Sequence, residues 1–174
     1  IIIDAGPDFR YQMLRSQVKD LRAILLTHGH KDHIGGLDDV RAFNWVKQGA
    51  VDVYGNEGTR EVVYKDFSYA FAAFRYPGVP EINYHVIDDR PFYIDDIQVV
   101  PIPVLHYKMP VLGFRIGNFA YITDAKTIPA SSMERLKGVE YLVINALRKE
   151  LHMSHFNLEE ALTMIARIQP KSAF

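Results

Sequence analysis

The chain has 174 residues, of which 48% are hydrophobic and 24% charged, a composition typical of a globular protein with an apolar core. Its 20 basic residues nearly balance its 21 acidic ones, so the overall charge does not favour a broad nucleic-acid surface. The chain contains no cysteine, which excludes disulfides and thiolate metal ligands. No apolar run approaches the roughly 18 to 20 residues of a membrane span, and no signal peptide is visible, so we expect a cytoplasmic protein.

The apolar pattern predicts alternating strands and helices in the first half of the chain. We expect strands over residues 1–4, 22–26 and 50–54, and helices over residues 7–17, 37–46 and 59–74. In the third helix Val63, Phe67 and Phe74 would share one buried face. In the second helix, we expect Trp45 to be a packing anchor.

After residue 82 the pattern changes to short strands separated by turn signals. We expect strands over residues 82–87, 91–94, 97–105, 112–116, 119–123 and 140–145, with at most a short helix over residues 133–136. The last helix is expected over residues 158–168, because Asn157 is a good N-cap and Glu160 would complete a capping box. The pattern predicts an α/β fold with two sheets and helices packed outside them.

Both ends of the chain fall inside expected strands. Ile1 starts an apolar run without an initiating Met, and residues 171–174 end where another strand begins. We therefore expect a single domain over residues 1–174, truncated at both ends.

Residues 27–36 follow an apolar strand and place His28, His30, Asp32 and His33 within six positions. Imidazole and carboxylate ligands suit zinc, manganese or iron. In an extended segment His28 and His30 point the same way and can converge on one ion, while the turn beyond them directs Asp32 and His33 to a second. Two neighbouring ions can generate hydroxide near neutral pH and clamp a phosphoryl or acyl oxygen. The cluster therefore predicts a binuclear metal site.

Each ion needs more ligands than this segment supplies, and further candidates follow later strands. His106 follows the strand over residues 97–105, and Asp124 follows the strand over residues 119–123. His152 and His155 lie in the loop before the last helix. Taken alone, such a residue is more often a turn former or a surface side chain.

The order of these motifs resembles that of the metallo-β-lactamase superfamily. Residues 28–33 match its HxHxDH signature, and Asp4 resembles an early aspartate that supports the metal loop without binding metal. His106 and Asp124 stand where the superfamily has its next histidine and its metal-bridging aspartate. The resemblance implies an αββα four-layer sandwich, with two β-sheets packed face to face and helices outside.

Within the superfamily the chain is most similar to the branch that contains the cyclic phosphodiesterase of the carbon–phosphorus lyase pathway. The similarity lies in residues 3–10, 112–114, 121–124 and 154–158, together with His106. That enzyme opens 5-phosphoribosyl 1,2-cyclic phosphate to the 1,5-bisphosphate. The resemblance therefore implies a small phosphate-ester substrate.

The resemblance also implies two divalent metal ions, Zn or Mn or alternatively Fe. One would be held by His28, His30 and His106. The second would be held by Asp32, His33 and a late histidine, with Asp124 bridging both. The late histidine would follow the strand that begins near residue 171.

His155 matches the position of a catalytic histidine that does not bind metal. It would act as a general acid toward the leaving oxygen or hold a phosphate oxygen, and the alternative is a loop histidine beside the helix cap. Asp32 is the other residue that we expect to be catalytic. His152 and Arg148 are candidates for substrate contacts, although His152 alternatively lies on the surface.

The leading hypothesis is a dimetal phosphodiesterase that acts on a small or cyclic phosphate ester. The alternatives are a transfer-RNA 3′-processing endonuclease, a lactone or thioester hydrolase, and a metal-binding protein without turnover. No membrane partner is expected, while nucleic acid and a second copy of the chain stay open as partners.

Overall fold

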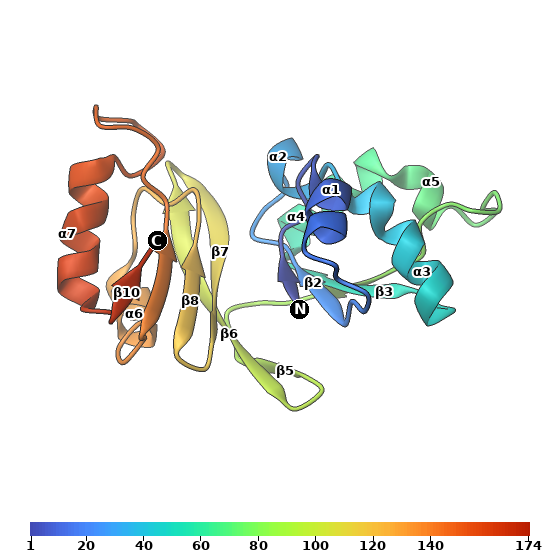
Figure 1. Cartoon of the computed structure of the whole chain (residues 1–174). Coiled ribbons are helices and arrows are strands. Elements are labelled where there is room, and N and C mark those ends of the chain that lie inside the picture. The colour runs from blue at the N-terminus through green and yellow to red at the C-terminus, as the bar shows by residue number, and fades with distance from the viewer. The chain divides into compact units, whose positions relative to one another are not determined.

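The computed structural model describes residues 1–174, which form two compact units, Ile1–Asp88 and Asp89–Phe174. Each unit contains one β-sheet and its own helices (Figure 1). The predicted α/β class with two sheets is therefore confirmed. None of the helices is both long enough and apolar enough to cross a membrane.

The sheet of Ile1–Asp88 has four strands, all parallel, in the order β1-β2-β3-β4. Parallel neighbours need crossover connections, and helices provide them here. The strands are β1 (Ile2–Ile3), β2 (Ala23–Leu25), β3 (Val51–Gly55) and β4 (Ile82–Val86). The helices are α1 (Phe9–Arg15), α2 (Lys31–Ile34), the 3₁₀ helix η1 (Leu37–Val40), α3 (Arg41–Lys47), α4 (Glu57–Asp66) and α5 (Ser68–Phe71).

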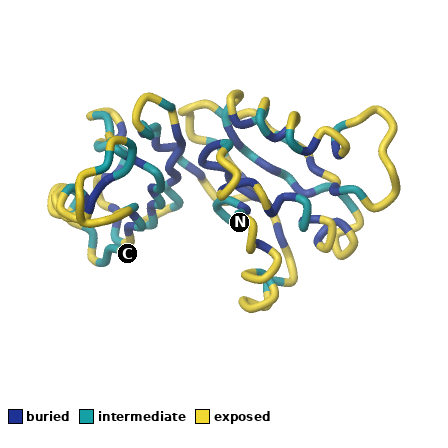
Figure 2. Tube along the Cα trace, turned by 90° about the horizontal axis from the view of Figure 1, so that it is seen from above, coloured by how far each residue is buried: buried dark blue, intermediate teal, exposed yellow.

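The core of this unit lies between the sheet and its helices. Phe9 of α1, Phe43 of α3 and Val63 of α4 belong to the same buried cluster as Val51 and Val53 of β3. Figure 2 marks buried positions in dark blue. Leu26 and Ile34 belong to the same cluster, so this core fixes both ends of residues 26–34, which carry the HxHxDH signature.

Two details of the predicted helices are wrong. The helix expected over residues 59–74 is divided at Phe67, and Phe74 lies beyond α5 with 88% of its surface exposed. Trp45 is 76% exposed and is not a packing anchor. It lies two positions after the buried Phe43, and residues two apart on a helix do not face the same side.

The sheet of Asp89–Phe174 has six strands in the order β10-β9-β8-β7-β6-β5. Strands β5 to β8 pair antiparallel with their neighbours in the chain, whereas β9 pairs parallel with β8 and with β10. The strands are β5 (Phe92–Ile94), β6 (Ile97–His106), β7 (Met109–Ile116), β8 (Phe119–Ile122), β9 (Tyr141–Ile144) and β10 (Ser172–Ala173).

The parallel strands of this sheet are joined through helices α6 (Ala130–Arg135) and α7 (Leu158–Ile168). Leu136, Leu142 and Phe156 belong to its buried cluster, together with Ile102 and Ile122. The bounds of α7 match the predicted ones, and its capping box is present. Asn157 Oδ1 accepts from the Glu160 N–H at 2.9 Å, and Glu160 Oε2 accepts from the Asn157 N–H at 3.0 Å.

We expect the Asn157→Ala substitution to lower the free energy of unfolding by about 1 to 2 kcal/mol, because one N-terminal amide of α7 loses its acceptor. Thr163→Ala, on the same helix, is the control and should change stability by less than about 0.5 kcal/mol. Urea unfolding followed by circular dichroism measures both. Equal stability of the two variants would contradict a stabilising cap.

Candidate metal centre

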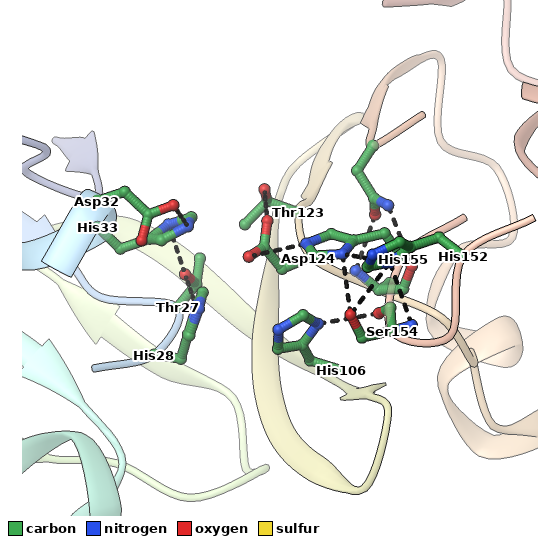
Figure 3. Close-up of polar contacts among 12 residues, drawn as sticks. Thr27, His28, Asp32, His33, His106, Thr123, Asp124, His152, Ser154 and His155 are labelled. Carbon is green, nitrogen blue, oxygen red and sulfur yellow. Dashed lines mark hydrogen bonds and ion pairs between the residues drawn. The ribbon is translucent and has the colours of Figure 1, made fainter. Parts of the chain in front are cut away.

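The first group of predicted ligands lies in the segment that follows β2. His30 has an extended backbone (φ −69°, ψ 150°), and α2 begins at the next residue and carries Asp32 and His33. The ring centroids of His30 and His33 lie 4.5 and 4.2 Å from that of His28. Asp32 Oδ2 is 3.4 Å from His33 Nε2 (Figure 3). An extended segment followed by a helical turn thus brings all four candidates together.

Asp4 holds this segment from the end of β1. Its Oδ1 accepts from the Thr27 N–H at 2.8 Å, and its Oδ2 lies 2.7 Å from His33 Nδ1. Because a carboxylate only accepts, His33 Nδ1 is the protonated nitrogen and Nε2 carries the lone pair. Burial raises the pKa of Asp4, and the contacts with His33 and Thr27 offset part of this effect.

Thr27 is a functional residue that the sequence argument missed. Its side chain is fully buried, and its Oγ1 lies 2.9 Å from Asp4 Oδ2. The same oxygen lies 3.0 Å from His28 Nδ1 (Figure 3). The hydroxyl has one proton, which it donates to the carboxylate, so His28 Nδ1 donates to the hydroxyl oxygen. Thr27 lies between an apolar strand and the first predicted ligand, and this position is the signal that could have identified it.

The backbone near Gly36 fixes the far end of the segment. The Ala5 N–H donates to the His33 carbonyl, and the Gly36 N–H donates to the Ala5 carbonyl, both at 2.8 Å. A Cβ on Gly36 would collide with the Gly6 carbonyl oxygen and with Phe9. Glycine is required here by close backbone approach, because Gly36 has an ordinary φ of −94°.

The second group of predicted ligands lies in the other unit. His106 is the last residue of β6, and Asp124 follows β8 with a left-handed backbone (φ 53°). His106 Nδ1 donates to the Ser154 carbonyl at 2.9 Å. His155 Nε2 lies 3.4 Å from Asp124 Oδ2, and the His106 and His155 ring centroids are 4.5 Å apart (Figure 3).

Asn145 ties the loop before α7 to the turn that carries Asp124. Its Oδ1 accepts from the Ala125 N–H at 2.8 Å, and its Nδ2 donates to the Ala125 carbonyl at 3.1 Å. The Phe156 N–H donates to the same carbonyl at 2.8 Å. These bonds hold His155 beside Asp124.

The structure gives the two candidate substrate contacts different surroundings. Arg148 is exposed and donates from Nη2 to the Leu151 carbonyl at 2.8 Å, within its own loop. His152 lies against His155. Desolvation lowers the pKa of His152, and the positive charge of Arg148 lowers it further. A substrate role stays a prediction for both.

In each unit the donors fit a metal ligand role. Three of the predicted ligands have Nδ1 in a hydrogen bond. The partner is Thr27 Oγ1 for His28, Asp4 Oδ2 for His33 and the Ser154 carbonyl for His106. Metal-binding histidines characteristically make such bonds, which fix the ring and direct the lone pair of Nε2. His85, in contrast, pairs with Asp52 at 2.9 Å and stacks on Tyr54, outside the candidate centre.

A family model described as "Beta-lactamase superfamily domain" matches residues 1–174. The chain belongs to this superfamily. The resemblance inferred from the HxHxDH segment is therefore confirmed.

Proteins similar to this chain carry several names. The crystal structure of a diphosphatase from the PhnP family is 35% identical, with a TM-score of 0.90 over 99% of this chain and 66% of that one. A protein of Porphyromonas gingivalis named octanoyltransferase is 40% identical over 97% of this chain and 34% of its own length. A ribonuclease Z of Nostoc punctiforme is 30% identical over 67% of this chain and 37% of its own length. The chain thus spans about a third of these two curated relatives.

We expect Asp4→Asn to weaken metal binding by the full-length protein about 10- to 100-fold, because the amide removes one of the acceptors that orient His33 and Thr27. Asparagine tolerates the left-handed backbone of Asp4 (φ 61°), so the change tests the hydrogen bonds rather than the turn. Asp8→Asn, at an exposed position, is the matched control. Titration with zinc and manganese measures both variants, and equal affinities would contradict the role of Asp4.

Proposed function

We propose that this chain is the catalytic part of a dimetal hydrolase that cleaves a small or cyclic phosphate diester, such as phosphoribosyl 1,2-cyclic phosphate. The observation that carries the proposal is the similarity to the PhnP-family diphosphatase, which extends over 99% of the chain at 35% identity. The hydrogen-bonded histidines of both units support the metal requirement.

In this proposal His28, His30 and His106 would hold one divalent ion, Asp32 and His33 would contribute to a second, and Asp124 would contribute to both. When bound, such ions act as Lewis acids toward a phosphoryl oxygen and make water a stronger nucleophile at neutral pH. Zinc and manganese both suit this set of imidazole and carboxylate donors. Asp32 is also proposed as a catalytic residue.

His155 provides the proton in this proposal. Its Nε2 lies 3.4 Å from Oδ2 of Asp124, one of the proposed metal ligands. From Nε2 the proton passes to the oxygen that leaves phosphorus, and the ring becomes neutral. The exposed Arg148 is proposed to contact a phosphate oxygen of the substrate.

A second candidate is hydrolysis of an acyl ester or thioester. The similarity to the protein named octanoyltransferase favours it, at 40% identity over 97% of the chain. The same ions would polarise a carbonyl oxygen.

Processing of transfer RNA is the third candidate, favoured by the ribonuclease Z similarity over 67% of the chain.

We expect the metal-loaded full-length protein to hydrolyse bis(p-nitrophenyl) phosphate, and His30→Ala or Asp124→Asn to lower the rate by about 100-fold or more through loss of a ligand. His85→Asn is the control, because His85 lies outside the candidate centre. Hydrolysis of p-nitrophenyl octanoate and cleavage of a transfer-RNA precursor are measured in parallel. Full activity in the ligand variants would refute the metal centre, and a preference for the ester or the RNA would select another candidate.

We expect His155→Gln to lower kcat by about 10²- to 10⁴-fold for an alkyl phosphate diester, because the poor leaving group needs a proton. The loss should be much smaller for a p-nitrophenyl diester, whose leaving group departs without protonation. Metal content, measured by elemental analysis, should not change. Equal losses on both substrates would contradict the role of His155 as general acid and favour a role in holding a phosphate oxygen.

A further inference from the structure

The loop before α7 brings three polar side chains into mutual contact. His155 Nδ1 lies 3.2 Å from His152 Nδ1 (Figure 3). Ser154 Oγ lies 3.1 Å from His155 Nδ1 and 3.2 Å from His152 Nδ1. The proposed function uses the opposite side of the His155 ring, where Nε2 approaches Asp124. It gives no role to the contact between the two histidines.

The donors and acceptors in this cluster can be assigned from one backbone group. The Ser154 N–H donates to His152 Nδ1 at 3.3 Å. A backbone amide nitrogen can only donate, so His152 Nδ1 carries a lone pair. His155 Nδ1 lies 3.2 Å from that lone pair, and two unprotonated nitrogens at this distance would repel each other. His155 Nδ1 therefore carries a proton, so a ring that has given up its Nε2 proton keeps its lone pair on Nε2.

The surrounding bonds hold this arrangement in place. The Ser154 carbonyl accepts from His106 Nδ1 at 2.9 Å, which fixes the backbone between the two histidines. On the other side, the Phe156 N–H donates to the Ala125 carbonyl at 2.8 Å. The peptide groups on both sides of His155 are thus fixed. Its side chain could still rotate about χ1 and χ2, and the contact with His152 removes this freedom.

We propose that His152 is a positioning residue that holds His155 in the Nδ1–H tautomer and so presents Nε2 as the nitrogen that exchanges a proton with substrate. The tautomer follows from the contacts above, and its use in catalysis rests on the proposed function. In the proton transfer, the bond between Nε2 and its proton breaks, a bond between the leaving oxygen and that proton forms, and Nδ1 keeps its own proton throughout.

The chemical consequence follows from comparison with a serine–histidine–aspartate triad. There a carboxylate accepts the Nδ1 proton, fixes the tautomer and also stabilises the imidazolium. His152 has an imidazole in that place, which fixes the tautomer without adding negative charge. His155 is therefore oriented from the Nδ1 side by a group without negative charge.

The tautomer can be read without any assay of activity. Full-length protein labelled with ¹⁵N-histidine is examined by long-range ¹H–¹⁵N correlation spectroscopy, and the His155 ring signals are identified by their loss in His155→Gln. We expect the Nδ1–H pattern for neutral His155 in the wild type and in Ser154→Ala, which keeps the backbone N–H and His152. In His152→Leu we expect a mixture of tautomers. An Nε2–H pattern in the wild type, or no change in His152→Leu, would overturn the proposal.

Kinetics on the phosphate substrate distinguish positioning from a general effect on folding. His152→Leu should lower kcat at least about tenfold with KM little changed, since proton transfer as a whole is worth about 10²- to 10⁴-fold. His152→Asn should restore most of the rate, because an asparagine amide oxygen can occupy the place of Nδ1 and accept the same bonds. Met153→Ala, an exposed position in the same loop, is the control.

The possible failures are distinguishable. Loss of metal from His152→Leu would make His152 a ligand and overturn the proposal, as would an equal loss of rate in the Leu and Asn variants. If the wild type hydrolyses no phosphate ester, the proposed function fails, and the tautomer measurement still decides whether His152 orients His155.

Discussion

Hydrogen bonds to Nδ1 determine what the histidines of the candidate centre can do. Nδ1 of His28 bonds to Thr27, that of His33 to Asp4, and that of His106 to the Ser154 carbonyl. Each of these bonds directs the Nε2 lone pair outward and prevents rotation of the ring. A ring without such a bond would lose rotational freedom whenever it bound an ion, and that entropy would reduce the affinity for metal. The residues behind the ligands therefore matter as much as the ligands.

The aspartates of the two units are both held in an unfavourable backbone conformation. Asp4 (φ 61°) follows β1, and Asp124 (φ 53°) follows β8. A left-handed conformation costs of order 1 kcal/mol or more for a residue with a Cβ, although aspartate tolerates it better than most. In each unit the turn directs a carboxylate toward a histidine, His33 in one and His155 in the other. Strain at the strand ends is consistent with a requirement for the carboxylates in these places.

The extent to which the sequence predicts this centre depends on the kind of atom involved. His28, His30, Asp32 and His33 are recognisable because side chains of metal-ligand type occur at a spacing that packing does not require. The acceptor of His106 is a backbone carbonyl, which any residue could provide, so no residue type identifies it. The same limit applies to the division of the predicted helix at Phe67, where the apolar spacing continues and only the backbone changes.

His155 differs from the other histidines because both of its nitrogens have a neighbour that can change its chemistry. On the Nε2 side, Asp124 Oδ2 lies 3.4 Å away. On the Nδ1 side, His152 fixes the direction of the ring but carries no negative charge in its neutral form. The two neighbours thus act on different nitrogens, since Asp124 lies beside the nitrogen that would exchange a proton and His152 contacts the nitrogen that keeps its own.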